Sequence, residues 1–174
     1  MTRRAVMALF AATIGLYLVM LLWSLPKIAA EAGGLTPFDM RPGGYSLAEA
    51  RAFLAALSPE GTAFYLGVQH RLDMVYPALL ALSLAIGLTW AWKGAPRAVL
   101  GLMVILTVAG AGFDYLENMW VGRMLAAGPE QVSPDIVAAA SLRSMLKAGL
   151  TTAAFSLLLI GLARRGWRSW RARA

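Results

Sequence analysis

Two pairs of charged residues stand at helical spacing beside two apolar stretches of this 174-residue sequence. Asp114 and Glu117 are three residues apart, and Arg143 and Lys147 are four apart, so each pair shares one face of a helix. Ionisable groups in membrane helices usually face the interior of the bundle and pair with one another. We therefore expect the two carboxylates to face the two cations, and Asn118 to hydrogen-bond across helices.

A third helix adds His70 and Asp73, three residues apart, with Pro77 one turn further on. Proline has no backbone N–H, so the carbonyl of Asp73 loses its helical partner, and we expect a kink or a free acceptor there. With Asp73 included, the predicted cluster has one more acid than cations. A bound cation, a proton, or an arginine of the preceding loop would balance it. The residues of that loop and of the start of the helix that are candidates to contribute are Asp39, Arg41, Tyr45, His70 and Arg71.

The same residues partly match the pattern of a metal site. His70-x-x-Asp73 on one helix and Asp114-x-x-Glu117 on the next resemble the histidine and carboxylate ligands of four-helix bundles. Those sites use two histidines and four carboxylates, and Lys147 would repel a cation. These four residues are therefore weak metal candidates, and no metal or other cofactor is predicted. Two carboxylates that share a site can also act as general acid and base.

Four apolar stretches carry these residues, over about 5–25, 74–92, 98–120 and 144–163. A helix needs about 20 residues to cross the hydrocarbon core of a bilayer, and 59% of all residues are hydrophobic. We predict one all-α integral membrane domain over 1–174, with four transmembrane helices in an antiparallel bundle. Ala30-Glu31-Ala32 resembles a signal-peptide cleavage site, but the first apolar run is longer than in a signal peptide, which favours a retained helix.

The distribution of charge predicts the orientation. Every Asp and Glu lies in 27–73 or 114–135, and the other segments carry only Lys and Arg. Positive charge is typical of cytoplasmic segments, so both termini are predicted in the cytoplasm, and loops 26–72 and 124–140 in the periplasm. The excess of thirteen Arg over three Lys favours a bacterial inner membrane protein. The net charge of +7 is explained by topology, so nucleic acid is not expected as a partner.

Local signals predict structure within the two outward loops. Ser46 and Glu49 form a capping-box pattern before a short amphipathic helix, which we expect to lie on the membrane surface or to cap the bundle. Gly128-Pro129 predicts a helix end and Ser133-Pro134-Asp135 a helix start.

Composition excludes several kinds of chemistry. The chain has no cysteine and one histidine, which excludes thiol redox chemistry, cysteine-bound zinc, and bis-histidine haem within one chain. The predicted function is non-enzymatic: a scaffold, an accessory subunit, or a protein that binds a lipid or small ligand in a charged pocket at the periplasmic leaflet. Expected partners are the bilayer, such a ligand, and another membrane protein or a second copy. The alternative is a membrane enzyme or transporter that uses the carboxylate and lysine cluster.

Overall fold

The computed structural model describes residues 2–172, and over that range it contains helices and no strands. Four helical segments are long and apolar enough to cross a membrane: Arg3–Glu31, Pro59–Ala91, Arg97–Gln131 and Pro134–Arg171. The prediction of an all-α protein with four potential spans is thereby confirmed. The elements are α1 (Arg3–Val19), η1 (Met20–Ser24), α2 (Leu25–Glu31), η2 (Phe38–Met40), α3 (Leu47–Ala56), α4 (Pro59–Phe64), η3 (Tyr65–Gln69), α5 (His70–Ala91), α6 (Arg97–Gln131) and α7 (Pro134–Arg171).

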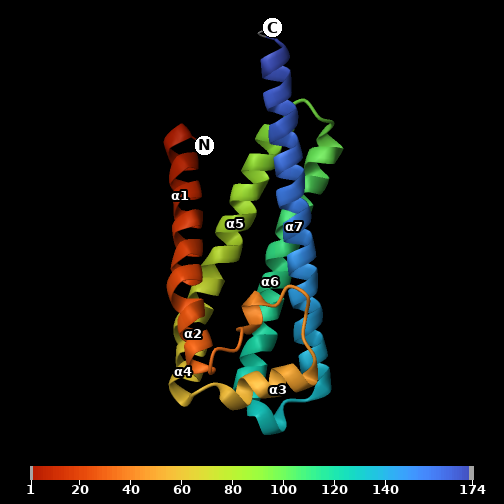
Figure 1. Cartoon of the computed structure of the whole chain (residues 1–174). Helices are drawn as coiled ribbons and strands as arrows, with labels where there is room; N and C mark the ends of the chain where they lie inside the picture. Colours follow the sequence, from red (N-terminus) through yellow and green to blue (C-terminus); the bar gives the residue numbers. More distant parts are fainter. Residues whose placement is uncertain (1, 173–174) are drawn as a thin grey trace.

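Both ends of the described chain lie at one end of the molecule, beside the connection between α5 and α6 (Figure 1). We call this the terminal end. The short helix α3 and the connection between α6 and α7 lie at the opposite end, which we call the α3 end (Figure 1). Helices α5, α6 and α7 pack against one another, whereas α1 packs mainly on α5.

The first two long helices each contain a π-helical turn, η1 and η3. A π turn inserts one extra residue into a helix and is frequent at functional sites. The two turns touch, because the Ser24 hydroxyl donates a 2.6 Å hydrogen bond to Oε1 of Gln69. The first helix continues through Pro26 to Glu31, beyond the span end at residue 25 that the sequence predicted.

The largest hydrophobic core lies at the α3 end. Helix α3 begins with the predicted capping box: the Glu49 N–H donates to the Ser46 hydroxyl at 3.2 Å, and the Ser46 N–H donates to the Glu49 carboxylate at 2.7 Å. Hydrogen bonds from the Ser46 N–H and from the Ser46 hydroxyl to the Glu49 carboxylate lower the pKa of Glu49 below its ordinary value. The buried face of α3, formed by Ala50, Phe53 and Leu54, packs on α6 and α7, so this helix caps the bundle.

The second connection is shorter than predicted. Residues 124–140 are helical except around Gly128 and at Val132–Ser133. Gly128 breaks the helix with φ 71°, a conformation that glycine adopts without a steric penalty, and Pro129 follows it. The Ser133 hydroxyl then accepts from the Ile136 N–H and starts α7. The start and stop signals were therefore correct, but residues 129–131 between them are helical, and the irregular part is confined to Gly128 and to Val132–Ser133.

Candidate functional site

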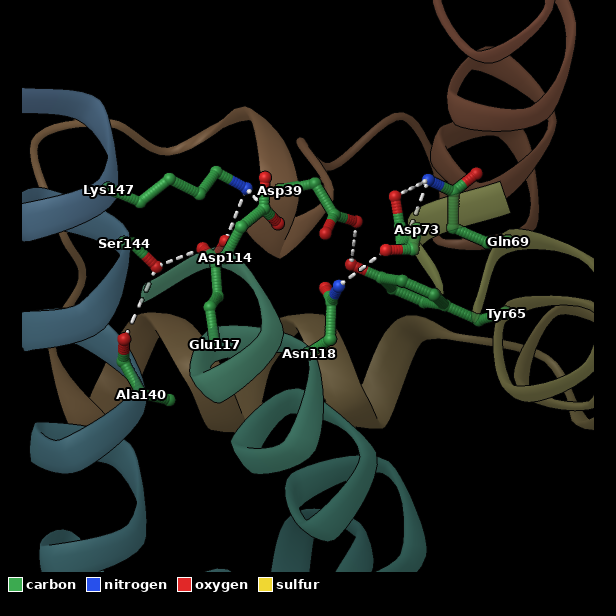
Figure 2. A network of polar contacts seen from close by, with 10 residues as sticks. All are labelled: Asp39, Tyr65, Gln69, Asp73, Asp114, Glu117, Asn118, Ala140, Ser144 and Lys147. Atoms are coloured by element: carbon green, nitrogen blue, oxygen red, sulfur yellow. Dashed lines mark hydrogen bonds and ion pairs between the residues drawn. The ribbon is translucent and has the colours of Figure 1, made fainter. Parts of the chain in front are cut away.

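An ion-pair cluster joins α6 to α7 near the α3 end (Figure 2). The Lys147 ammonium lies 3.2 Å from Asp114 and also binds the carboxylate of Glu117. The Ser144 hydroxyl donates to the second oxygen of Glu117. The predicted pairing of Asp114 and Glu117 with Lys147 is confirmed. Because the Glu117 side chain is 1% exposed, Lys147 and Ser144 together compensate a carboxylate removed from water.

Arg143 does not join this cluster, so that part of the prediction was wrong. Its guanidinium donates to the Ala139 carbonyl at 2.8 Å and lies 5.4 Å from the centre of the Trp120 ring. The long side chain turns from the carboxylates to an aromatic face on α6, which attracts a cation as well. Lys147 is left as the cation of the cluster.

Asp73 on α5 forms the second part of the site. Its two carboxylate oxygens accept from Nε2 of Gln69 at 3.1 and 3.0 Å. Its backbone carbonyl, which Pro77 leaves without a helical donor, accepts from Nδ2 of Asn118 at 3.3 Å. The predicted free acceptor is therefore satisfied from α6, and Asn118 acts across helices as predicted.

Asp39 is brought to the same region by the first loop. Its carboxylate accepts a 2.5 Å hydrogen bond from the Tyr65 hydroxyl (Figure 2). The preceding residue, Phe38, is fully buried, with its ring 4.9 Å from that of Tyr45 and 4.7 Å from that of Phe53. This aromatic packing anchors η2 to the bundle and thereby directs Asp39 toward the helices.

Arg41 and Tyr45, the other loop candidates, serve the packing of the loop. Arg41 donates to the Thr36 carbonyl at 2.9 and 2.6 Å, and its guanidinium lies within 6 Å of three aromatic rings. Tyr45 is buried, and within residues 2–172 its hydroxyl has no hydrogen-bond partner. Burial raises the pKa of the Tyr45 hydroxyl above its ordinary value.

The histidine lies apart from the cluster. The His70 ring packs against Gly122 on α6, where a Cβ atom would lie 3.4 Å from the ring, and Arg71 is exposed. Within the described residues no group of three or more His, Asp and Glu is placed to hold a metal ion. The candidate ligands His70, Asp73, Asp114 and Glu117 thus do not converge on one point.

The charged residues stand at one end of a cavity of about 610 Å³ between α1, α5 and α7. Asp39, Asp73, Asp114 and Lys147 line that end. The rest is mainly apolar and is lined from α1 by Phe10, Thr13, Ile14 and Tyr17, from α5 by Tyr76, Leu80, Ser83 and Leu84, and from α7 by Ala148, Thr151, Thr152, Phe155 and Leu158. On α1 and α7 these residues recur every three or four positions, so each helix presents one face.

The cavity is open between α1 and α7. Ile14 and Tyr17 on one side are 56% and 45% exposed, and Phe155 on the other is 43% exposed. In the apolar part the hydroxyls of Thr13 and Ser83 lie 2.8 Å apart and join α1 to α5. The lining along α7 runs from Lys147 to Leu158, a rise of about 16 Å.

The charges around this cavity do not balance. Three carboxylates, those of Asp39, Asp73 and Asp114, line it with one ammonium, and Glu117 stands just behind Lys147. The excess of acid is larger than the sequence predicted, because Arg143 pairs elsewhere and Asp39 is added. The site therefore offers more hydrogen-bond acceptors than its own donors occupy.

Comparison with protein-family models, curated proteins and solved structures finds no match to this chain. The candidate site is accordingly defined by its geometry and chemistry.

Several polar residues of the site were missed from the sequence: Ser24, Tyr65, Gln69 and Ser144. Two had a usable signal. Ser144 precedes Lys147 by three residues and Gln69 precedes Asp73 by four, so each shares a helix face with a predicted site residue. Ser24 and Tyr65 belong to the site through hydrogen bonds to Gln69 and Asp39, which are far away in the sequence, and no local pattern predicts such contacts.

Proposed function

We propose that this protein binds a lipid or another amphipathic molecule in the cavity between α1, α5 and α7. The apolar part of the ligand lies along α1 and α7, and its polar head meets Asp39, Asp73, Asp114 and Lys147. One observation supports this most: a 610 Å³ cavity that is apolar along its length, charged at one end and open at its side. Ligand pockets have volumes of about 300–1,000 Å³, with a few convergent polar groups among apolar walls.

The proposed setting is a bacterial inner membrane. We propose an antiparallel four-helix bundle with its terminal end in the cytoplasm and α3 in the periplasm. Lys93 and Arg97, between the second and third spans, and the arginines of 164–171 support this orientation, because positive charge gathers on the cytoplasmic side. The charged end of the cavity then lies in the outer leaflet, and a lipid enters sideways between α1 and α7.

The acidic excess favours a ligand head that donates hydrogen bonds. Lys147 is already held by Asp114 and Glu117, so it has little capacity left for an anionic head. Asp39 and Asp73 each accept from one uncharged protein donor, Tyr65 and Gln69, and retain free lone pairs. A primary ammonium or a polyol supplies the missing donors.

Native mass spectrometry of gently extracted protein tests this proposal. Phosphatidylethanolamine and phosphatidylcholine of equal chain length are offered as probes, because both are zwitterionic and only the first donates hydrogen bonds from its amine. We expect the wild-type protein to retain phosphatidylethanolamine preferentially. Ala148→Trp should abolish retention, because Ala148 lines the cavity and an indole there fills it.

The matched control is Ala153→Trp on the same helix. Ala153 is exposed and does not line the cavity, so this variant should retain the lipid as the wild type does. Equal retention by the two tryptophan variants would show that the lipid binds elsewhere. If the two lipids are retained equally, the cavity still binds lipid, but the proposal that it selects a head group with hydrogen-bond donors is wrong.

The orientation has its own test. The natural chain has no cysteine, so single cysteines at the exposed residues Gly34 and Gly94 report on one site each. A membrane-impermeant maleimide applied to cells with a permeabilised outer membrane should label the first variant alone. Labelling of Gly94→Cys alone would reverse the proposed topology.

A catalytic role is a second candidate, favoured by Asp73 and Asp39 lining the same cavity without a cation bound to either within residues 2–172. Two such carboxyl groups can serve as general acid and base on a bound head group. Recovery of the retained lipid with a changed mass after incubation would support this reaction, whereas an unchanged mass supports binding alone.

A further inference from the structure

A second, smaller cavity lies at the terminal end, away from the acidic cluster. It has a volume of about 210 Å³ and is formed between the α5–α6 connection and the last turns of α7. Figure 1 shows that connection beside α7 at this end of the molecule. Four of its lining residues are cationic: Lys93, Arg164, Arg165 and Arg168. We call it the basic pocket.

Within the part of the chain that the structure describes, no acidic side chain neutralises the basic pocket. Along α5 the nearest acid, Asp73, is about 28 Å from Trp92, and along α6 the nearest, Asp114, is about 25 Å from Arg97. The ion pairs within residues 2–172 both involve Lys147 at the α3 end. Four like charges around a small concavity repel one another, and a bound anion relieves that repulsion.

Two of the guanidinium groups are held in place by aromatic rings. Arg164 lies 5.3 Å from the centre of the Trp92 ring, and Arg165 lies 4.2 Å from that of Trp90. Arg165 also donates to the Trp90 carbonyl at 3.2 Å, at the end of α5. The Trp92 indole is itself fixed by a 3.0 Å hydrogen bond to the Leu157 carbonyl. Ordered guanidinium groups bind an oxyanion with little further loss of side-chain freedom.

We propose that the basic pocket binds the phosphate of an anionic phospholipid. Planar guanidinium groups match phosphate geometry, and the pocket can accept one such group. Trp90 and Trp170, 53% and 62% exposed at this end of the bundle, are residues that settle at the level of lipid head groups. A phosphate tethered to acyl chains is therefore already present at this depth. The proposal involves no residue of the larger cavity and stands independently of its function.

Lipid retention by the full-length protein in detergent tests the proposal, with dioleoyl phosphatidylglycerol and dioleoyl phosphatidylcholine as probes. We expect the wild type to prefer the anionic lipid, and the double variant Lys93→Gln/Arg168→Gln to bind it at least about tenfold more weakly, since each basic residue at a surface adds about 1 kcal/mol. Both residues lie outside the stacked pairs, so the change leaves the tryptophan contacts intact.

The control is Arg3→Gln/Arg4→Gln, which removes two charges from the same end of the bundle outside the pocket. An equal loss in both double variants would overturn the proposal, because it would indicate diffuse attraction to a charged surface. Inorganic phosphate serves as a competitor in a final measurement. If millimolar phosphate displaces phosphatidylglycerol fully from the wild type, the pocket selects the free anion and the lipid assignment fails.

Discussion

Asn118 on α6 supplies the hydrogen bond that Pro77 denies to the backbone of Asp73 on α5. The proline removes the donor four residues beyond that carbonyl, and the Asn118 side-chain amide takes its place at 3.3 Å. One residue of a neighbouring helix thus compensates a defect in the backbone of another. The same Asp73 lines the charged end of the larger cavity, where its carboxylate accepts from Gln69.

Replacing Asn118 by leucine should lower the free energy of unfolding by about 1 kcal/mol, since a buried carbonyl is left without a donor. In a Pro77→Ala background the restored backbone N–H bonds that carbonyl, and the same replacement should cost less than half as much. Unfolding of the four proteins in mixed micelles measures both costs. An equal cost in the two backgrounds would mean that Asn118 stabilises the bundle by other contacts.

Lys147 should be the most costly single residue of the site to remove. Lys147→Met leaves Asp114 and the buried Glu117 without a cation, and we expect a loss of about 3 kcal/mol in unfolding free energy. Adding Asp114→Asn and Glu117→Gln should recover much of this loss, because neutral side chains need no counter-charge. A triple variant as unstable as Lys147→Met would show that the lysine acts through its packing.

The capping box of α3 should respond to pH. The hydrogen bonds from Ser46 lower the pKa of Glu49 below its ordinary value of 4.5, so the stabilisation is fully present above that value. It is lost as the pH falls through the lowered pKa. Hydrogen exchange at the first turn of α3, corrected for intrinsic rates, should therefore show weaker protection in strong acid. Glu49→Ala should show weak protection at every pH.

Gly161 lets α7 pack tightly against the end of α5. A Cβ atom there would lie 2.6 Å from Nε1 of Trp92 and 2.9 Å from Cβ of Ala91. Gly161→Val should therefore displace the indole and reduce unfolding free energy by about 2 kcal/mol. The matched control, Gly149→Val on the same helix, meets nothing within 4 Å and should cost little or nothing, because valine has a higher helix propensity than glycine. Similar losses in both would rule out a packing effect.

Much of this fold could be predicted from the alternation of apolar and charged segments and from the spacing of residues. Apolar runs bounded by charges predict helices that can span a membrane. The spacing of Asp114, Glu117 and Lys147 predicts that they meet, because residues at similar depths in neighbouring antiparallel helices lie side by side. The capping box and the signals at Gly128 and Ser133 depend only on residues close in sequence, so they too can be predicted.

The remainder depends on contacts between distant segments. Asp39 reaches the site because Phe38 packs on Phe53, a contact between irregular segments that periodicity does not encode. Arg143 had two favourable partners, a carboxylate and the Trp120 ring, and its sequence position is the same for either. The cavity itself arises because α1 packs on α5 and leaves space beside α7, and the composition of those helices does not specify that space.

The core at the α3 end combines residues from two separate stretches of the sequence, 28–65 and 121–140. A ribosome makes the chain from its N-terminus, so this core stays incomplete until α7 begins to emerge. The loop that carries Asp39 belongs to the same core and cannot settle earlier. The α7 residues that line the larger cavity, from Lys147 to Leu158, follow this core in the sequence. Synthesis therefore completes the cavity last, and a truncated chain without α7 would lack the site.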